Sequence, residues 1–258
     1  MTFEASRILA IMAHPDDIEF VCAGTLILLR NAGCHITMIN VANGDCGSMD
    51  TPPEKIAVIR DAEAKTSAAL IGADHACVGL HDLRVFRTEE TQALVTEAVR
   101  RANPDIVFTH PPSDYMSDHE VTSLLARDAC FIGPMPNYKT GAKNPAPVLA
   151  HPPYLYYGDR IRAIDSDGRM TDAAFYVDIT SVIDKKVEML CCHASQRDWL
   201  RRQHDVDEYV EMLKAWNAAR GKEVGVKYAE AFRQSRGHGF PPDNKLRELI
   251  RPFVIETS

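Results

Sequence analysis

The sequence predicts an α/β fold in which a mostly parallel sheet carries helices on both faces. Short runs rich in β-branched residues alternate with longer helical stretches, and this order is typical of parallel strands joined by right-handed crossovers. Hydrophobic residues make up 45% and charged residues 25% of the 258 residues, as in ordinary globular domains. No internal repeat and no linker divides the chain, so we expect a single domain over residues 1–258.

The first half of the chain contains strands and helices in strict alternation. Gly33 closes the first helix. The second helix opens at Pro52, where Thr51 and Glu54 have the spacing of a capping box. We expect strands at residues 7–13, 35–41, 76–80 and 105–109, and helices at residues 18–31, 52–70, 89–101 and 119–130. Ligands of such sheets bind beyond the carboxyl ends of the strands.

The chain changes character after Cys130. Residues 133–153 hold six prolines, too many for a helix or an inner strand, so we expect a long surface loop near the strand ends that shapes a substrate cleft. A basic tail containing glycine follows Phe232. Between loop and tail we expect strands at residues 154–158 and 173–179 and helices at residues 181–195 and 206–219.

Charge and N-terminal residues exclude several classes of protein. Lys and Arg total 29 and Asp and Glu total 36, and the formal charge of −7 argues against a nucleic-acid partner. The longest apolar stretch, residues 20–29, is far shorter than the ~20 residues that span a bilayer. The N-terminus also lacks the pattern of a secretory signal. Seven cysteines without C-x-x-C pairs suggest neither a disulfide framework nor an all-cysteine zinc site. We therefore expect a cytoplasmic protein without a membrane span.

Polar residues follow the first predicted strand directly. His14, Asp16, Asp17 and Glu19 lie within six residues of one another, and three carboxylates beside one imidazole repel each other unless a cation is present. His14 offers a borderline nitrogen and Asp17 a hard oxygen, so a strand-to-helix turn can aim both at one metal ion. The alternative is a helix start at which Asp16 or Asp17 is the N-cap.

A second polar cluster, residues 110–120, follows the fourth predicted strand. Both clusters leave a parallel sheet at the same edge, so His119 can complete a His, Asp, His site with one open position. This is the pattern of catalytic zinc, which lowers the pKa of a bound water toward about 7. Taken alone, His119 is instead a surface or capping imidazole at a helix start.

The stretch Ala13-His14-Pro15-Asp16-Asp17-Ile18-Glu19, together with Asp118-His119, resembles the PIG-L/LmbE family of zinc-dependent de-N-acetylases. The resemblance implies a Rossmann-like fold and hydrolysis of the N-acetyl group of an amino sugar or a related acetamide, in a substrate of the glycan, glycolipid or thiol-glycoside type. It implies one Zn2+ per chain, with other divalent metals open, and it leaves homo-oligomers open. Further matches are Asn43-Gly44-Asp45-Cys46-Gly47-Ser48, Arg60 with Glu63, His193-Ala194-Ser195-Gln196 and Tyr228-Ala229-Glu230-Ala231-Phe232.

By motif position, the resemblance implies His14, Asp17 and His119 as zinc ligands. It also implies Asp16 as the general base and Arg60 as a residue beside the substrate. For Asp118 we expect a supporting role that orients a neighbouring ligand.

The sequence departs from the family at Met116. Members often carry His-Pro-Asp-His where this chain has Met116-Ser117-Asp118-His119. A thioether cannot donate a hydrogen bond to an oxyanion. We therefore expect another donor, with His193 as the first candidate ahead of His110 and Tyr115.

Two roles and one alternative function remain open. Asp45 bonds either a sugar hydroxyl or only the backbone of its turn. His193 either reaches the site or complements a helix C-terminus. The alternative to a hydrolase is a sugar- or metal-binding protein that kept the fold without the chemistry.

Overall fold

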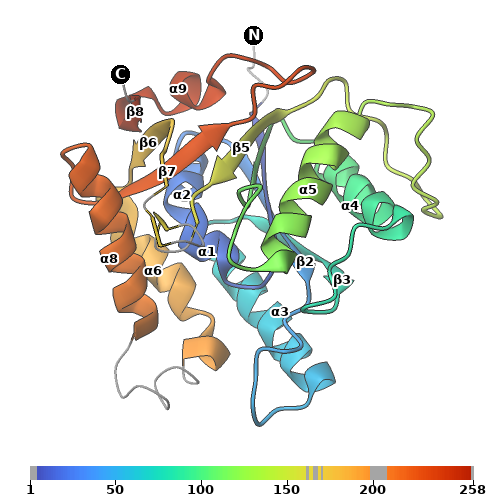
Figure 1. Ribbon diagram of the computed structural model, residues 1–258, viewed down its shortest axis with the longest axis horizontal. Helices are drawn as coiled ribbons and strands as arrows, with labels where there is room; N and C mark the ends of the chain where they lie inside the picture. The colour runs from blue at the N-terminus through green and yellow to red at the C-terminus, as the bar shows by residue number, and fades with distance from the viewer. Residues whose placement is uncertain (1–4, 161–162, 165–167, 170, 198–207, 257–258) are drawn as a thin grey trace.

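The centre of the molecule is a sheet of eight strands. Their spatial order is β3 (Asp74–Leu80), β2 (His35–Ala42), β1 (Arg7–Met12), β4 (Ile106–Thr109), β5 (Tyr154–Gly158), β7 (Ala229–Gln234), β6 (Phe175–Asp178) and β8 (Val254–Glu256) (Figure 1). The computed structural model describes residues 5–160, 163–164, 168–169, 171–197 and 208–256.

Most strands of the sheet point the same way. Strands β3, β2, β1, β4 and β5 pair in parallel. Strand β7 runs antiparallel to both β5 and β6, and β8 runs antiparallel to β6, so β7 and β8 alone oppose the common direction among the described strands. The predicted α/β class with a mostly parallel sheet is confirmed.

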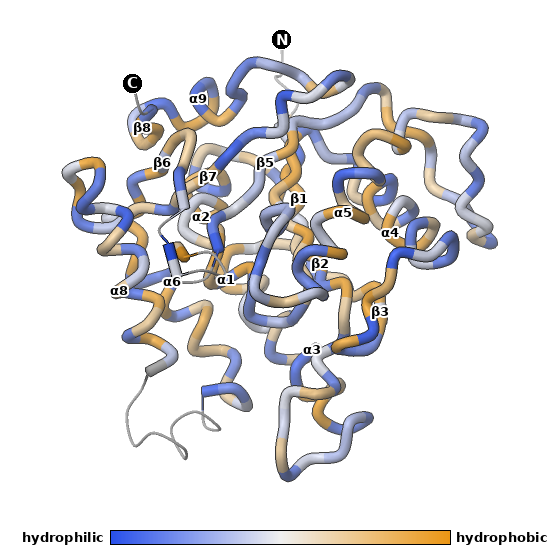
Figure 2. Tube along the Cα trace, viewed as in Figure 1, coloured by the Kyte–Doolittle hydropathy of each residue, from blue (hydrophilic) through white to orange (hydrophobic). Residues whose placement is uncertain are grey.

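Strand β1 is apolar on both faces, so helices must bury both faces of the sheet. Ile8, Ala10 and Met12 pack into one buried cluster, while Leu9 and Ile11 pack into the other. A strand buried on both faces has a continuous apolar run rather than an alternating pattern. The hydropathy colouring in Figure 2 shows this apolar strand in the middle of the molecule.

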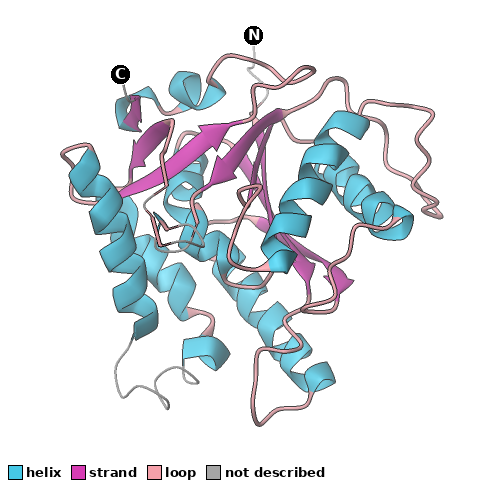
Figure 3. Cartoon of the chain, in the orientation of Figure 1, coloured by secondary structure: helices cyan, strands magenta, loops and turns pink. Residues whose placement is uncertain are grey.

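Helices form the two outer layers (Figure 3). Helices α4 (Glu89–Ala102) and α5 (Ser117–Ile132) cover one face, and their apolar residues join the cluster of Leu9 and Ile11. The opposite face is covered by α1 (Asp17–Val21), α2 (Ala23–Asn31), α3 (Pro53–Ala69), α6 (Ile183–Cys191) and α8 (Glu208–Glu223). Within the described residues, no helix is both long enough and apolar enough to cross a membrane.

Several predicted boundaries differ from the structure. The helix expected at residues 18–31 is two helices, because the backbone breaks at Cys22 with φ −144°. The expected capping box is absent, because Pro52 is the N-cap of α3 and no side chain caps it. The predicted helix at residues 181–195 is a 3-10 turn at Thr180–Val182 followed by α6, and residues 206 and 207 of the last predicted helix lie outside the described residues.

The chain after Phe232, for which we predicted no strand or helix, contains regular secondary structure. Its first residues complete strand β7, and helix α9 (Lys245–Leu249), a 3-10 turn at Arg251–Phe253 and strand β8 follow. The sequence Ala-Glu-Ala-Phe-Arg-Gln of β7 has little strand propensity. Pairing with β5 and β6 on its two sides holds it in the sheet.

The proline-rich loop lies at the other end of the sheet from the one we expected. Helix α5 runs from the carboxyl edge of the strands back to their amino edge, so the loop starts there. Arg100 of α4 holds the loop by donating to the carbonyls of Gly133, Met135 and Tyr138. Residues 149–152 lie around a cavity with Arg7, the first residue of β1. The loop therefore does not shape a cleft at the carboxyl edge.

A buried ion pair ties the C-terminal half of the chain to the first helices. Lys186 of α6 is fully buried, and its Nζ donates to Glu230 Oε1 of β7 over 2.7 Å and to the Phe20 carbonyl over 2.9 Å. The Glu230 carboxylate also accepts the backbone N–H groups of Gly24 and Thr25. A carboxylate from β7 thus caps the start of α2, where the sequence offers no cap of its own.

We expect Lys186→Ala to lower the free energy of unfolding by about 3–5 kcal/mol, because it leaves the Glu230 charge buried without its partner. Urea denaturation followed by circular dichroism measures this loss. The matched control is Lys185→Ala on the same helix, which removes an exposed pair with Glu188 and is expected to cost less than about 1 kcal/mol. Equal losses for both variants would contradict the role of the buried pair.

Candidate metal centre and cleft

The candidate site lies where the strand order reverses. The chain leaves β1 toward β2 on one side, and β4 pairs with β1 on the other side. Loops at such a switch point diverge and leave a crevice at the carboxyl edge. His14 and Asp17 follow β1, while His119 lies in the first turn of α5 after β4. The sheet thus brings together residues that are about a hundred positions apart in the chain.

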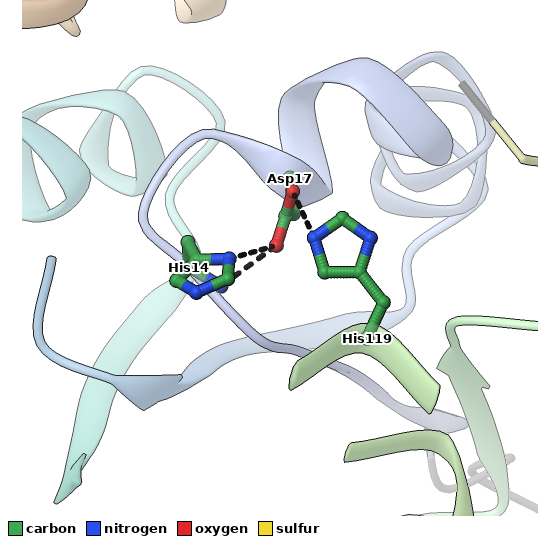
Figure 4. A group of neighbouring side chains, drawn as sticks. All are labelled: His14, Asp17 and His119. Atoms are coloured by element: carbon green, nitrogen blue, oxygen red, sulfur yellow. Dashed lines mark hydrogen bonds and ion pairs between the residues drawn. The ribbon is translucent and has the colours of Figure 1, made fainter. Parts of the chain in front are cut away.

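Three side chains form the centre of the site (Figure 4). His14, Asp17 and His119 are buried, and they offer ligand atoms that all lie within 4.8 Å of one another. His14 Nδ1 lies 3.4 Å from Asp17 Oδ2, and His119 Nε2 lies 3.5 Å from Asp17 Oδ1. Metal–ligand bonds of about 2.0–2.1 Å in a tetrahedron separate ligand atoms by about 3.3 Å. The donor set and its spacing therefore fit a zinc ion.

Each imidazole of this set has a carboxylate at its other nitrogen. His14 Nε2 lies 3.0 Å from Asp118 Oδ2, and His119 Nδ1 lies 3.2 Å from Asp114 Oδ1. Such contacts fix the orientation of metal-binding imidazoles. Burial lowers the pKa of His14, but the bonds with Asp118 and Asp17 outweigh it and raise the pKa to about 10. The pocket thus favours a positive charge on or beside this imidazole.

The carboxylate of Asp17 is surrounded by nitrogen atoms. Its Oδ2 accepts the His14 backbone N–H over 2.7 Å and lies 3.2 Å from His110 Nε2. Burial would raise the pKa of Asp17, but His119 and His110 hold it well below its ordinary value. His110 stacks on His119 with ring centroids 4.0 Å apart. His110 is buried beside Asp17 and His119 and is not among the described residues that line the cleft, so contact with substrate stays a prediction for it.

Asp16 has a strained backbone and two side-chain partners. Its φ of 104° is rare for a residue other than glycine, and its side chain caps no helix. Oδ2 accepts a hydrogen bond of 2.5 Å from the hydroxyl of Tyr209 in α8, and Oδ1 lies 3.4 Å from Arg60 Nη2. Burial raises the pKa of Asp16 despite the opposing charge of Arg60.

Arg60 extends from α3 beneath two backbone turns. Its guanidinium donates to the carbonyls of Pro15 and Gly44 over 2.6 and 3.3 Å. Gly44 has a φ of 79°, and a Cβ there would lie 2.7 Å from Arg60 Cδ. Glycine is therefore required at this turn by both its backbone angle and its close contact with Arg60.

A cleft of about 450 Å³ opens above these groups. Tyr115 contributes to its wall, with its ring edge-on to His119 at 5.3 Å. Met116, which replaces the family histidine, also lines the cleft. The described lining residues are His14, Asp16, Cys46, Gly47, Ser48, Met49, Arg60, Asp82, Leu83, Tyr115, Met116 and Gln196.

Asp45 and His193 are not among the described residues that line the cleft, and neither are His110, Asp17, Asp118 and His119. The Asp45 carboxylate accepts the Asp82 backbone N–H over 3.0 Å and lies 2.5 Å from His81 Nδ1, so it contacts the loop after β3 rather than the backbone of its own turn. His193 is fully buried, with Nε2 3.2 Å from Glu19 Oε1. In this structure neither side chain is placed to contact a molecule in the cleft.

The sequence interpretation missed three residues of the site. Asp114 contacts His119, Tyr209 contacts Asp16, and Asp82 accepts the backbone N–H groups of Gly44 and Cys46. Asp114 lies in the second polar cluster, so its position in the sequence was a usable signal. Tyr209 lies in an ordinary helical pattern far along the chain, and nothing local distinguishes it.

Comparison with known proteins adds independent findings. Residues 9–130 match the family model described as PIG-L: GlcNAc-PI de-N-acetylase. The chain is similar to 4-oxalmesaconate hydratase from Pseudomonas putida KT2440, with 26% identity over 89% of this chain and 86% of that protein. Diacetylchitobiose deacetylase from Thermococcus kodakarensis is 24% identical over 89% of this chain and 83% of that protein.

A solved structure gives the same architecture. N,N'-diacetylchitobiose deacetylase from Pyrococcus horikoshii matches with a TM-score of 0.75 and 24% identity, over 92% of this chain and 88% of that chain. At this level of identity the likeness shows a shared fold.

We expect the protein to bind about one Zn2+ per chain and Asp17→Ala to lose most of it. Removal of a ligand should weaken binding by more than the ~10- to 100-fold that changes in supporting residues cost. Elemental analysis after dialysis against limiting Zn2+ measures the content. Asp74→Ala, which removes an exposed carboxylate at the start of β3, is the control and should retain the metal. Full occupancy in Asp17→Ala would refute the ligand set.

Proposed function

Because this chain belongs to the PIG-L family, we propose that it is a zinc-dependent hydrolase that removes an N-acetyl group from an amino sugar or a related acetamide. One observation carries the proposal: Asp16, a carboxylate outside the candidate metal-binding set, lines the same cleft as the candidate ligand His14. The similarity to diacetylchitobiose deacetylase supports the reaction class.

In this proposal His14, Asp17 and His119 hold the metal. When bound, zinc supplies a Lewis acid for the substrate carbonyl and lowers the pKa of water. Asp16 accepts the proton of the attacking water and returns it to the departing amine. Its raised pKa suits a group that must take up and release a proton. Tyr209 and Arg60 hold its two oxygens in place.

The donor to the developing oxyanion needs a new assignment. Met116 lines the cleft, but its thioether cannot donate a hydrogen bond. His193 is buried beside Glu19. Tyr115 lines the same cleft and packs against His119. A phenol remains protonated near neutral pH and can donate its O–H. We therefore place Tyr115, rather than His193, in this role.

A hydratase is the second candidate, because the hydratase of Pseudomonas putida matches most of this chain. Sites for substrates with several carboxylates normally use several arginines or lysines. Among the described residues that line this cleft, Arg60 is the single arginine or lysine. The geometry therefore favours a substrate with little negative charge, as an acetamide of an amino sugar is.

We expect the zinc-loaded protein to release acetate from at least one member of a panel of N-acetylglucosamine derivatives. Asp16→Asn should retain the metal and lose about 10²- to 10⁴-fold in turnover, as loss of a general base does. A coupled acetate assay and metal analysis on the same samples provide both readouts, with Asp74→Asn as control. Near-normal turnover in Asp16→Asn would assign the base elsewhere. Hydration of an unsaturated carboxylic acid without acetate release would favour the hydratase.

Tyr209→Phe should lower kcat by about 10- to 100-fold with metal content unchanged, because a hydrogen bond to a charged group contributes about 1.5–3 kcal/mol. In the Asp16→Asn background, Tyr209→Phe should not lower kcat any further. The matched control is Tyr176→Phe, which removes a tyrosine hydroxyl bonded to Glu223 at the other end of α8. A kcat loss that persists without Asp16 would indicate a purely structural effect.

A further inference from the structure

A buried asparagine of β2 contacts the loop that carries His14. Asn40 is 2% exposed, and its Nδ2 donates to the His14 carbonyl over 2.7 Å. Its side chain follows those of Ile36 and Met38 on one face of the strand, and both of these residues belong to the apolar core. Asparagine is depleted in strands, and a buried amide is costly unless it is hydrogen-bonded. An apolar residue would serve for burial alone, so hydrogen bonds are what asparagine adds at this position.

The backbone of His14 lies beyond the regular pairing of β1. This strand ends at Met12, which pairs with Asn40. The His14 N–H donates to the Asp17 carboxylate over 2.7 Å, and the His14 carbonyl accepts a longer bond of 3.3 Å from the Asp17 backbone N–H. Asn40 adds the shorter bond to this carbonyl, and it does so from outside the turn. The peptide that carries the candidate ligand is therefore fixed to strand β2 as well as to its own turn.

A histidine of the edge strand β3 holds Asn40 in turn. His75 Nε2 lies 3.0 Å from Asn40 Oδ1, and the His75 side chain is 4% exposed. The His14 carbonyl can only accept, so the Asn40 amide presents Oδ1 to His75, and His75 Nε2 must carry a proton. Burial lowers the pKa of His75, which favours this neutral form. His75 Nδ1 makes no hydrogen bond to a described residue, so the hydrogen bond of this imidazole goes to Asn40.

We propose that Asn40 and His75 are positioning residues for the metal ligand His14. His75 orients the Asn40 amide, and Asn40 fixes the peptide from which the His14 imidazole extends. This inference rests on the candidate metal set of the proposed function. Neither Asn40 nor His75 is among the described residues that line the cleft, so their effect should appear in the affinity for the metal. Loss of a residue that orients a metal ligand commonly weakens metal binding about 10- to 100-fold.

The test measures Zn2+ affinity by competition with a chromophoric chelator, and the stability of the metal-free protein by urea denaturation. Asn40→Leu should weaken Zn2+ binding about 10-fold, at the lower end of that range because Asn40 acts through the backbone. The matched control is Gln92→Leu, which also replaces a buried amide that donates to a backbone carbonyl, that of Leu125 in α5. Gln92→Leu should lose stability and retain the wild-type affinity. A loss of stability with unchanged affinity in Asn40→Leu would show a purely structural role and overturn the inference.

Substitutions at His75 test the second member of the pair. His75→Leu frees the Asn40 amide to rotate and should weaken Zn2+ binding about threefold, near the low end of what a neutral hydrogen bond contributes. His75→Gln keeps an N–H donor for Asn40 Oδ1 and should retain the wild-type affinity. Because His75 acts through Asn40, the double variant Asn40→Leu with His75→Leu should bind Zn2+ no more weakly than Asn40→Leu.

The His75 variants also decide the question if Asn40→Leu does not fold. Equal affinities in His75→Leu and His75→Gln would then contradict the inference. A wild-type protein that binds Zn2+ together with unaffected Asn40 and His75 variants would overturn the positioning role and leave the proposed function intact. A wild-type protein that binds no Zn2+ would overturn the candidate metal centre and the proposed function with it.

Discussion

A single buried carboxylate, that of Asp17, is the constraint around which the site is arranged. Burial of a charge is costly unless positive partners surround it, and Asp17 has imidazoles on both sides and the backbone N–H of His14 at 2.7 Å. His14 and His110 come from the loops after β1 and β4, and His119 comes from the first turn of α5. The charge of Asp17 has these imidazole partners only where the segments after β1 and β4 lie close together. Strands β1 and β4 are neighbours in the sheet, which places the two segments side by side.

Support for the site comes from successively more distant parts of the chain. Asp114 and Asp118 orient the two histidines, and the Leu83 backbone orients Asp118 in turn. Behind α1, Lys186 and Glu230 join α6 and β7 to the start of α2. The C-terminal half therefore supplies no residue of the candidate metal set, yet it holds in place the helices that carry this set.

Asp16 and Asp17 are adjacent in sequence and differ in environment. Asp17 faces the histidines, and its pKa is held low, whereas burial raises the pKa of Asp16. At Asp16 the backbone φ is positive, and the carboxylate contacts Tyr209 and Arg60 while it lines the cleft. Two identical residues thus become suited to different tasks because the backbone bends sharply between them.

The sequence by itself determined the parallel part of the sheet and the gathering of His14, Asp17 and His119. Both follow from local patterns: apolar runs mark the strands, and polar clusters mark their carboxyl ends. It did not determine strand β7, whose residues pair only because β5 and β6 lie beside them. Tertiary structure alone decided that Tyr209 contacts Asp16, that His193 lies beside Glu19 and that Asp45 accepts the Asp82 backbone N–H. The direction of a side chain depends on the packing of distant elements such as α6 and α8, and no local pattern records that packing.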